Sequence, residues 1–232
     1  MHTSMVALNT PPSWAPIRVL RWVRVVVGCL AIVKGVALAL HGAPVALLIP
    51  WFACAGLMAV EVAQRLAAIG LVVLGVVLFL TGFHSNQAYL MLILCFLLVL
   101  PSENTWVLWL MRWQLSIVYG FAAVAKINDS WMSGCALEVF FGRAMLPLDP
   151  LLGLAQPIAL SVIGVEALLA VAPWFARLRL SAVFLAAGTH LGMLVVAISW
   201  ADLIDLFVFA GLTGVLFASF FAHPVCRFSE PK

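Results

Sequence analysis

Residues 105–126 read TWVLWLMRWQLSIVYGFAAVAK, and this run decides the fold class. About 20 mostly apolar residues in a helix cross the hydrocarbon core of a bilayer. Runs of this kind recur along the chain, in which 66% of the 232 residues are hydrophobic and 9% are charged. A soluble domain carries about 25% charged residues, so this chain cannot cover a surface that faces water. The composition excludes a soluble enzyme, a disordered chain and a nucleic-acid-binding protein, and it predicts an all-α transmembrane helix bundle.

Breaks at polar, proline or glycine residues divide the chain into successive apolar segments. Only helices and closed barrels satisfy their own backbone polar groups in lipid, so each segment is expected to be a helix. We predict about eight spans: 20–40, 43–61, 66–83, 87–101, 105–126, 152–173, 178–199 and 203–222. They form one transmembrane domain over 20–222, between an N-terminal segment, 1–19, and a tail, 223–232.

The basic residues predict the orientation, because lysine and arginine near the ends of spans favour the cytoplasmic side. Eight crossings with the N-terminus inside leave Lys126 and Arg143 on the outer side. The other cations near span ends then all lie inside: Arg18, Arg21, Arg24, Arg65, Arg177, Arg179, Arg227 and Lys232. We therefore expect a multi-pass membrane protein with both termini in the cytoplasm.

The longest connection, residues 127–150, lies on the outer side in this topology. Its segment Ala136 to Phe141 is too short to span but apolar enough for a half-helix that enters the outer leaflet. We expect this re-entrant or half-helix within 131–147. Because no large soluble domain is expected on either side, any chemistry should take place in a cavity among the helices that opens outward.

Ionisable residues inside spans are costly in lipid, so each is a functional candidate by default. Lys34 and Glu166 lie midway along the first and sixth spans and could be counter-ions of each other, either as a structural pair or on a path for protons or a ligand. His190 in the seventh span is either a hydrogen-bonded packing residue or a ligand-binding one. Asp202 and Asp205 open the last span, where the helix dipole accounts for them.

The fifth span carries Arg112, Tyr119 and Lys126 at intervals of seven, so the three share one helix face, and we expect that face to contact protein. Lys126 lies at the outer end of the span and either reaches the headgroups or acts as a base. A base must be uncharged, which a water-poor cavity favours. His84 and Asn86 follow the third span and could point into the same cavity. No spacing of histidines and carboxylates suggests a metal site.

The centre of the chain resembles a known membrane family. Arg112-Trp113-Gln114, Ile117-Val118-Tyr119, Lys126 and Trp131 to Gly134 resemble its pattern R-x-Q, I-V-Y, a lysine and W-x-x-G. This is the horizontally transferred transmembrane (HTTM) family, which is related to the membrane domain of vitamin K-dependent γ-carboxylase.

Two further segments are similar to parts of the same family. His84 to Leu90, HSNQAYL, looks like the family's H-N-x-x-Y-L segment, and Gly164 to Glu166 with Thr189 to Leu191 look like its later polar positions. The resemblance covers roughly residues 15–220. It is moderately specific in the central motif and weak elsewhere.

The resemblance implies a site for a reduced quinone of the vitamin K or menaquinone type, with no metal. Lys126 matches the lysine regarded as the base that deprotonates the hydroquinone before its oxygenation, and His84 matches a histidine that assists at this site. The activity implied is a carboxylase-like reaction, that of a quinone-dependent lyase or oxygenase. Residues expected to line or orient the site are Tyr119, Asn86, Trp131, His190 and Glu166.

The chain also departs from the carboxylase. Ala125 stands where the carboxylase has a second basic residue, and no large luminal domain for a peptide substrate is expected after the last span. Modification of a peptide would then need a partner subunit or a small secreted peptide that binds the outer side. Two alternatives stay open: a non-catalytic membrane scaffold or assembly partner, and a small-solute or proton carrier that uses Lys34, Glu166 and His190.

Overall fold

A computed structural model describes residues 15–83, 85–100, 106–217 and 220, with only the backbone given for 15–17 and 86–88. These residues form helices and connecting turns, and no strand occurs among them, which confirms the all-α prediction. The main helices are α1 (Ala15–Leu40), α2 (Val45–Ala59), α3 (Gln64–Leu80), α4 (Asn86–Val99), α5 (Trp106–Ala125), α8 (Ala155–Val171), α9 (Arg179–Val195) and α10 (Trp200–Phe217). Short helices lie between them: α6 (Asp129–Met132), α7 (Cys135–Phe141), η1 (Asp149–Leu154), η2 (Ala172–Trp174) and η3 (Ala176–Leu178).

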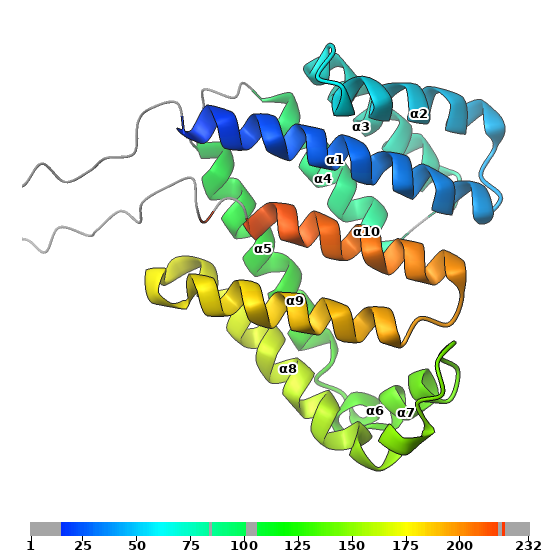
Figure 1. Cartoon of the computed structure of the whole chain (residues 1–232), viewed down its shortest axis with the longest axis vertical. Coiled ribbons are helices and arrows are strands. Elements are labelled where there is room, and N and C mark those ends of the chain that lie inside the picture. The colour runs from blue at the N-terminus through cyan, green and yellow to red at the C-terminus, as the bar shows by residue number, and fades with distance from the viewer. Residues whose placement is uncertain (1–14, 84, 101–105, 218–219, 221–232) are drawn as a thin grey trace, which may run out of the picture.

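The helices pack into one bundle in which α1 and α10 lie side by side and run in opposite directions (Figure 1). α1 also packs against α2, α2 against α3, and α3 against α4. On the other side of α10 lies α9, while α5 packs against α8. The short helices α6 and α7 lie at one end of α8 (Figure 1). Segments far apart in the sequence, the first and last helices above all, therefore form the centre of the bundle.

Each of the eight apolar segments contains one helix, but the helices differ in length. Within the described residues, five helical stretches are long and apolar enough to cross a membrane: Arg18–Leu40, Trp106–Ala125, Asp149–Trp174, Ala176–Val195 and Trp200–Phe217. Helices α2, α3 and α4 have 15, 17 and 14 residues, whereas a span takes about 20. The structure is that expected of a membrane protein, and eight crossings with both ends inside stay a prediction.

The long connection after α5 contains the half-helix that its sequence predicts, here the seven-residue α7. Gly134 precedes α7 with φ at 88°, and a Cβ atom there would lie 2.5 Å from the backbone nitrogen of Gln156. Only glycine allows both this conformation and this close approach. Leu137 and Phe141 of α7 form a small buried cluster with Ala159 of α8. The turn therefore fixes α7 against the start of α8, and its entry into a membrane leaflet stays a prediction.

Two arginines bind backbone carbonyls at the end of α4. Arg24 donates to the carbonyl oxygen of Leu98 at 3.1 Å and to that of Leu100 at 3.0 Å, and Arg65 Nε donates to Val99 O at 2.9 Å. The last carbonyls of a helix have no partner within it, so these contacts satisfy groups that the helix leaves open. Two of the arginines predicted to be cytoplasmic thus lie together at one end of the bundle.

Helices α1 and α2 approach each other closely at Gly28. A Cβ atom at Gly28 would lie 2.6 Å from the backbone nitrogen of Ala59 and 3.0 Å from Ala55 O, so the two backbones approach as only glycine permits. A Cβ atom placed in the same way on Gly56 of α2 would have no neighbouring atom within 4 Å. The two glycines therefore form a matched pair for testing the packing.

Gly28→Ala should lower the free energy of unfolding by about 1–3 kcal/mol, because overpacking forces α1 and α2 apart. Gly56→Ala should leave it unchanged or raise it slightly, since alanine favours a helix. The measurement is unfolding of the purified protein in mixed micelles as the SDS fraction rises. Equal stability of the two variants would contradict the packing described for α1 and α2.

Candidate functional site

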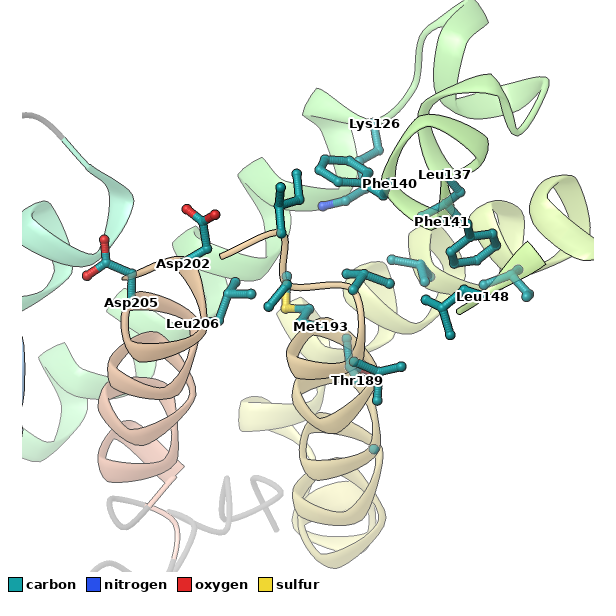
Figure 2. A pocket seen from close by; sticks show the side chains of 18 of the residues that line it. Lys126, Leu137, Phe140, Phe141, Leu148, Thr189, Met193, Asp202, Asp205 and Leu206 are labelled. Carbon is teal, nitrogen blue, oxygen red and sulfur yellow. The ribbon is translucent and has the colours of Figure 1, made fainter. Parts of the chain in front are cut away.

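The main cavity, of about 1440 Å³, lies between α1, α5, α7, α8, α9 and α10. Most of its lining is apolar, including Leu137, Phe140, Phe141 and Met193, whose side chains point toward the space in Figure 2. The polar and charged side chains of the lining are few: Lys34, His41, Ser85, Lys126, Ser161, Thr189, Asp202 and Asp205. The cavity is therefore an apolar space with a few charged groups in its walls.

Lys126 forms an ion pair with Glu166 in one wall of this cavity. Its Nζ donates to both carboxylate oxygens of Glu166 at 2.8 Å and makes a longer contact, 3.3 Å, to Ala122 O. The Glu166 side chain is 2% exposed and that of Lys126 is 14% exposed. Lys126 Nζ also lies 5.1 Å from the centre of the Trp131 ring, within reach of a cation–π contact. Of the two residues, Lys126 therefore lines the main cavity and Glu166 does not.

The expected pairing of Lys34 with Glu166 is wrong. Lys34 Nζ instead donates to Asp205 Oδ1 at 2.7 Å and contacts Ser85 Oγ at 3.4 Å, and His41 Nε2 lies 3.5 Å from Asp205 Oδ2. The reason is the helix order: α1 packs on α10, whereas α8 packs on α5. The sequence shows how deep each charge lies along its helix, but it does not show which helices are neighbours.

The helix dipole alone does not account for both acidic residues of α10. Asp202 behaves as expected at a helix start. Its Oδ2 accepts a hydrogen bond from Ser199 Oγ at 2.6 Å, and its backbone N–H donates to Ser199 Oγ at 3.1 Å. Asp205 lies one turn further in, is buried, and serves as the counter-ion of Lys34. Sequence reasoning missed this role, although an aspartate past the first turn of an apolar helix was a signal of a buried partner.

A second, smaller space of about 230 Å³ lies beside the Lys126–Glu166 pair. It is bordered by Tyr119 and His190, and His190 Nε2 lies 2.9 Å from Tyr119 Oη and 2.7 Å from Thr213 Oγ1. His190 is buried in this contact, which is the hydrogen-bonded packing role that we gave as one of two alternatives. Tyr119, Glu166 and His190 are thus brought together around the small space.

The face shared by Arg112, Tyr119 and Lys126 points inward, as its spacing predicts, since Arg112 and Tyr119 are buried. Trp131 also lines the main cavity. The candidate residue His84 and the side chain of Asn86 lie outside the described residues. Ser85 between them lines the main cavity, so the connection from α3 to α4 reaches it.

The comparisons with known proteins add no relative. No family model, no curated protein and no solved structure matches the chain. Among the residues that the structure describes there is also no group of three or more histidine, cysteine, aspartate or glutamate residues placed to hold a metal ion.

The chemistry open to Lys126 follows from its partner. An ammonium group has no lone pair, so Lys126 cannot accept a proton from a ligand unless it first gives one away. It can give a proton to Glu166 and take one from a third molecule, which leaves a neutral carboxylic acid, an ammonium and a new anion beside that ammonium. The arrangement therefore allows the pair to act as one unit, with Glu166 as the final proton acceptor and Lys126 as the group that stabilises the anion.

Lys126→Met should lower the free energy of unfolding by about 3 kcal/mol, because it leaves Glu166 buried without a counter-ion. The double variant Lys126→Met/Glu166→Leu should recover most of this loss, since it removes both charges. SDS-titrated unfolding of the single and double variants measures the difference. A single variant as stable as the double one would contradict the buried pair.

Proposed function

We propose that this chain is an integral membrane protein that binds a reduced quinone, or a similar lipid-soluble aromatic alcohol, in the main cavity and removes a proton from its hydroxyl group. The observation that carries the proposal is the Lys126–Glu166 pair, whose cation borders a large apolar cavity while its anion is enclosed. An apolar pocket with a few convergent polar groups is the usual form of a small-molecule site.

The size of the cavity supports a ligand larger than a single ring. Ligand pockets commonly measure about 300–1,000 Å³, and this cavity measures about 1440 Å³. It therefore has room for a two-ring headgroup together with part of a hydrocarbon chain. Phe184 and Val195 of α9 border the cavity and are themselves exposed, so the cavity reaches the surface of the bundle that lipid chains would cover.

The proposed reaction begins with the hydroxyl group of the ligand beside Lys126 Nζ. Lys126 passes a proton to Glu166 and receives the hydroxyl proton, so the ligand O–H bond breaks and an O–H bond forms on Glu166. The ligand oxygen becomes an anion that Lys126 stabilises in a site with little water, where such a contact is strong. Trp131 forms part of the wall against which the aromatic ring would lie.

The remaining parts of this proposal rest on the resemblance to the HTTM family. In that reading His84 assists Lys126, and Asn86, Tyr119 and His190 orient the site. Oxygenation of the quinol anion and modification of a peptide bound by a partner subunit would follow at the outer side of a bacterial inner membrane.

The other two hypotheses make different demands on the same residues. A scaffold or assembly partner would tolerate removal of both charges of the Lys126–Glu166 pair while depending on the surface of 131–147. A carrier would lose transport on changes to Lys34, Glu166 or His190, which lie in three separate contacts in the structure. Uptake into proteoliposomes, with and without a pH gradient, identifies a carrier.

Binding of 1-naphthol tests the proposal, because its ionised form absorbs at longer wavelength than its neutral form. The protein in lipid nanodiscs should bind 1-naphthol and shift part of it to the ionised spectrum at a pH where the free compound is neutral. Lys126→Met/Glu166→Leu should bind it about tenfold more weakly and show no ionised form, since a hydrogen bond to a charged group contributes about 1.5–3 kcal/mol.

The matched control is Lys34→Met/Asp205→Leu, which removes the other ion pair of the cavity and should retain the ionised spectrum. Unchanged binding to the double variant at Lys126 and Glu166, or no binding to the unaltered protein, would contradict the proposed function.

A further inference from the structure

Two ion pairs border the main cavity, and they present opposite partners to it. In the pair between α5 and α8 the more exposed side chain is the cation, Lys126, at 14% against 2% for Glu166. In the pair between α1 and α10 it is the anion, Asp205, at 13% against 3% for Lys34. The residues Lys126 and Asp205 lie on opposite sides of the cavity in Figure 2.

The cavity therefore has a hydrogen-bond donor, Lys126, in one wall and a hydrogen-bond acceptor, Asp205, in the other. An ammonium only donates hydrogen bonds and a carboxylate only accepts them. The 3.3 Å contact from Lys126 Nζ to Ala122 O is long, so a ligand oxygen can replace it. Among the described residues Asp205 Oδ1 accepts from Lys34, while Oδ2 has only the 3.5 Å approach of His41. A carboxylate offers about four acceptor positions, so Asp205 has capacity for a further donor.

Apart from Asp202, whose carboxylate accepts from Ser199, the labelled side chains between the two walls are apolar (Figure 2). Leu206 of α10 and Met193 of α9 line the cavity between Asp205 and Lys126, and Phe140 closes it near Lys126 (Figure 2). A molecule that spans from one wall to the other must therefore have an apolar middle and a polar group at each end. The end at Lys126 must accept a hydrogen bond, and the end at Asp205 must donate one.

We infer that Asp205, held by Lys34, is a second recognition site of the main cavity, and that it binds the far hydroxyl group of a rigid aromatic diol whose near oxygen contacts Lys126. This inference rests on the proposed function and narrows its ligand class to molecules with two opposed oxygens. The near hydroxyl loses its proton to Glu166 through Lys126, whereas the far hydroxyl keeps its proton and donates it to Asp205. A molecule with a single hydroxyl leaves the carboxylate of Asp205 without this donor.

The competing role of the Lys34–Asp205 pair is purely structural, as a clamp between α1 and α10. The two roles differ in what a substitution changes. A clamp affects every ligand of the cavity to the same extent through the fold. A recognition site affects only ligands that carry the second hydroxyl group. The change that a substitution makes in the ratio of the two affinities therefore separates these roles, and comparing the variant with the unaltered protein also cancels the different partition of the two probes into lipid.

The experiment compares 1,4-dihydroxynaphthalene with 1-naphthol, which lacks the second hydroxyl, under oxygen-free conditions in nanodiscs. In the unaltered protein the second hydroxyl should strengthen binding about tenfold, as expected for a hydrogen bond to a charged acceptor. Asp205→Asn should reduce this preference to about threefold or less, and Lys34→Met/Asp205→Leu should abolish it. Asp202→Asn is the matched control, because Asp202 lines the same cavity one turn earlier but is held by Ser199; it should keep the full preference.

Three results would overturn the inference while leaving the proposed function intact. They are equal affinity of the unaltered protein for the diol and for 1-naphthol, the same change of preference in Asp205→Asn and Asp202→Asn, and a loss of both affinities in equal proportion in the variants of Asp205. The last result would assign the pair to the clamp alone. No binding of either compound to the unaltered protein would instead remove the proposed function, and this inference with it.

Discussion

The structure depends on how its inward-facing charges are paired. A lone ion inside a helix bundle in lipid costs several kcal/mol, so an inward-facing cation needs backbone carbonyls, as Arg24 has, or a counter-ion on a neighbouring helix. Lys34 takes Asp205 and Lys126 takes Glu166. The first contact joins α1 to α10, the first and last of the described helices, and the second joins the end of α5 to α8. The main cavity lies between the two pairs.

The sequence was sufficient for those features that depend on one segment at a time. Apolar runs located all the main helices, the short apolar stretch after Trp131 predicted α7, and intervals of seven predicted the inward face of α5. Lys126 was singled out because, with Arg143, it lies on the outer side of the predicted topology, whereas the other cations near span ends lie inside. In each case the relevant physics, burial and helical periodicity, acts within a single helix.

Features that depend on which helices are in contact could not be predicted from the sequence. Lys34 and Glu166 lie at similar relative positions in their own segments, so a pair between them was reasonable, yet the helices that carry them are not packed together. Asp205 was assigned to a helix dipole because nothing in its own segment shows that Lys34 faces it. The assignment of a counter-ion needs the order of helices in space, which the hydropathy of single segments does not contain.

The pairing also changes the chemistry expected at Lys126. A lysine alone in an apolar cavity would be a simple base, whereas a lysine that contacts both oxygens of a buried glutamate is placed to stabilise an anion. In the proposed reaction the proton-accepting role passes to Glu166, which does not line the main cavity. This division of roles, together with Asp205 on the opposite wall, turns an apolar space into one that can orient a ligand.

The central claim is that a hydroxylated aromatic ligand lies in the main cavity beside Lys126. Photolabelling with a naphthoquinone that carries an aryl azide, reduced before irradiation, followed by mass spectrometry of the peptides, tests it most directly. The account predicts labels on the end of α5, on α7 and on α9, and loss of these labels when 1,4-dihydroxynaphthalene is added in excess. Labels confined to α2 and α3, which the diol does not displace, would contradict it.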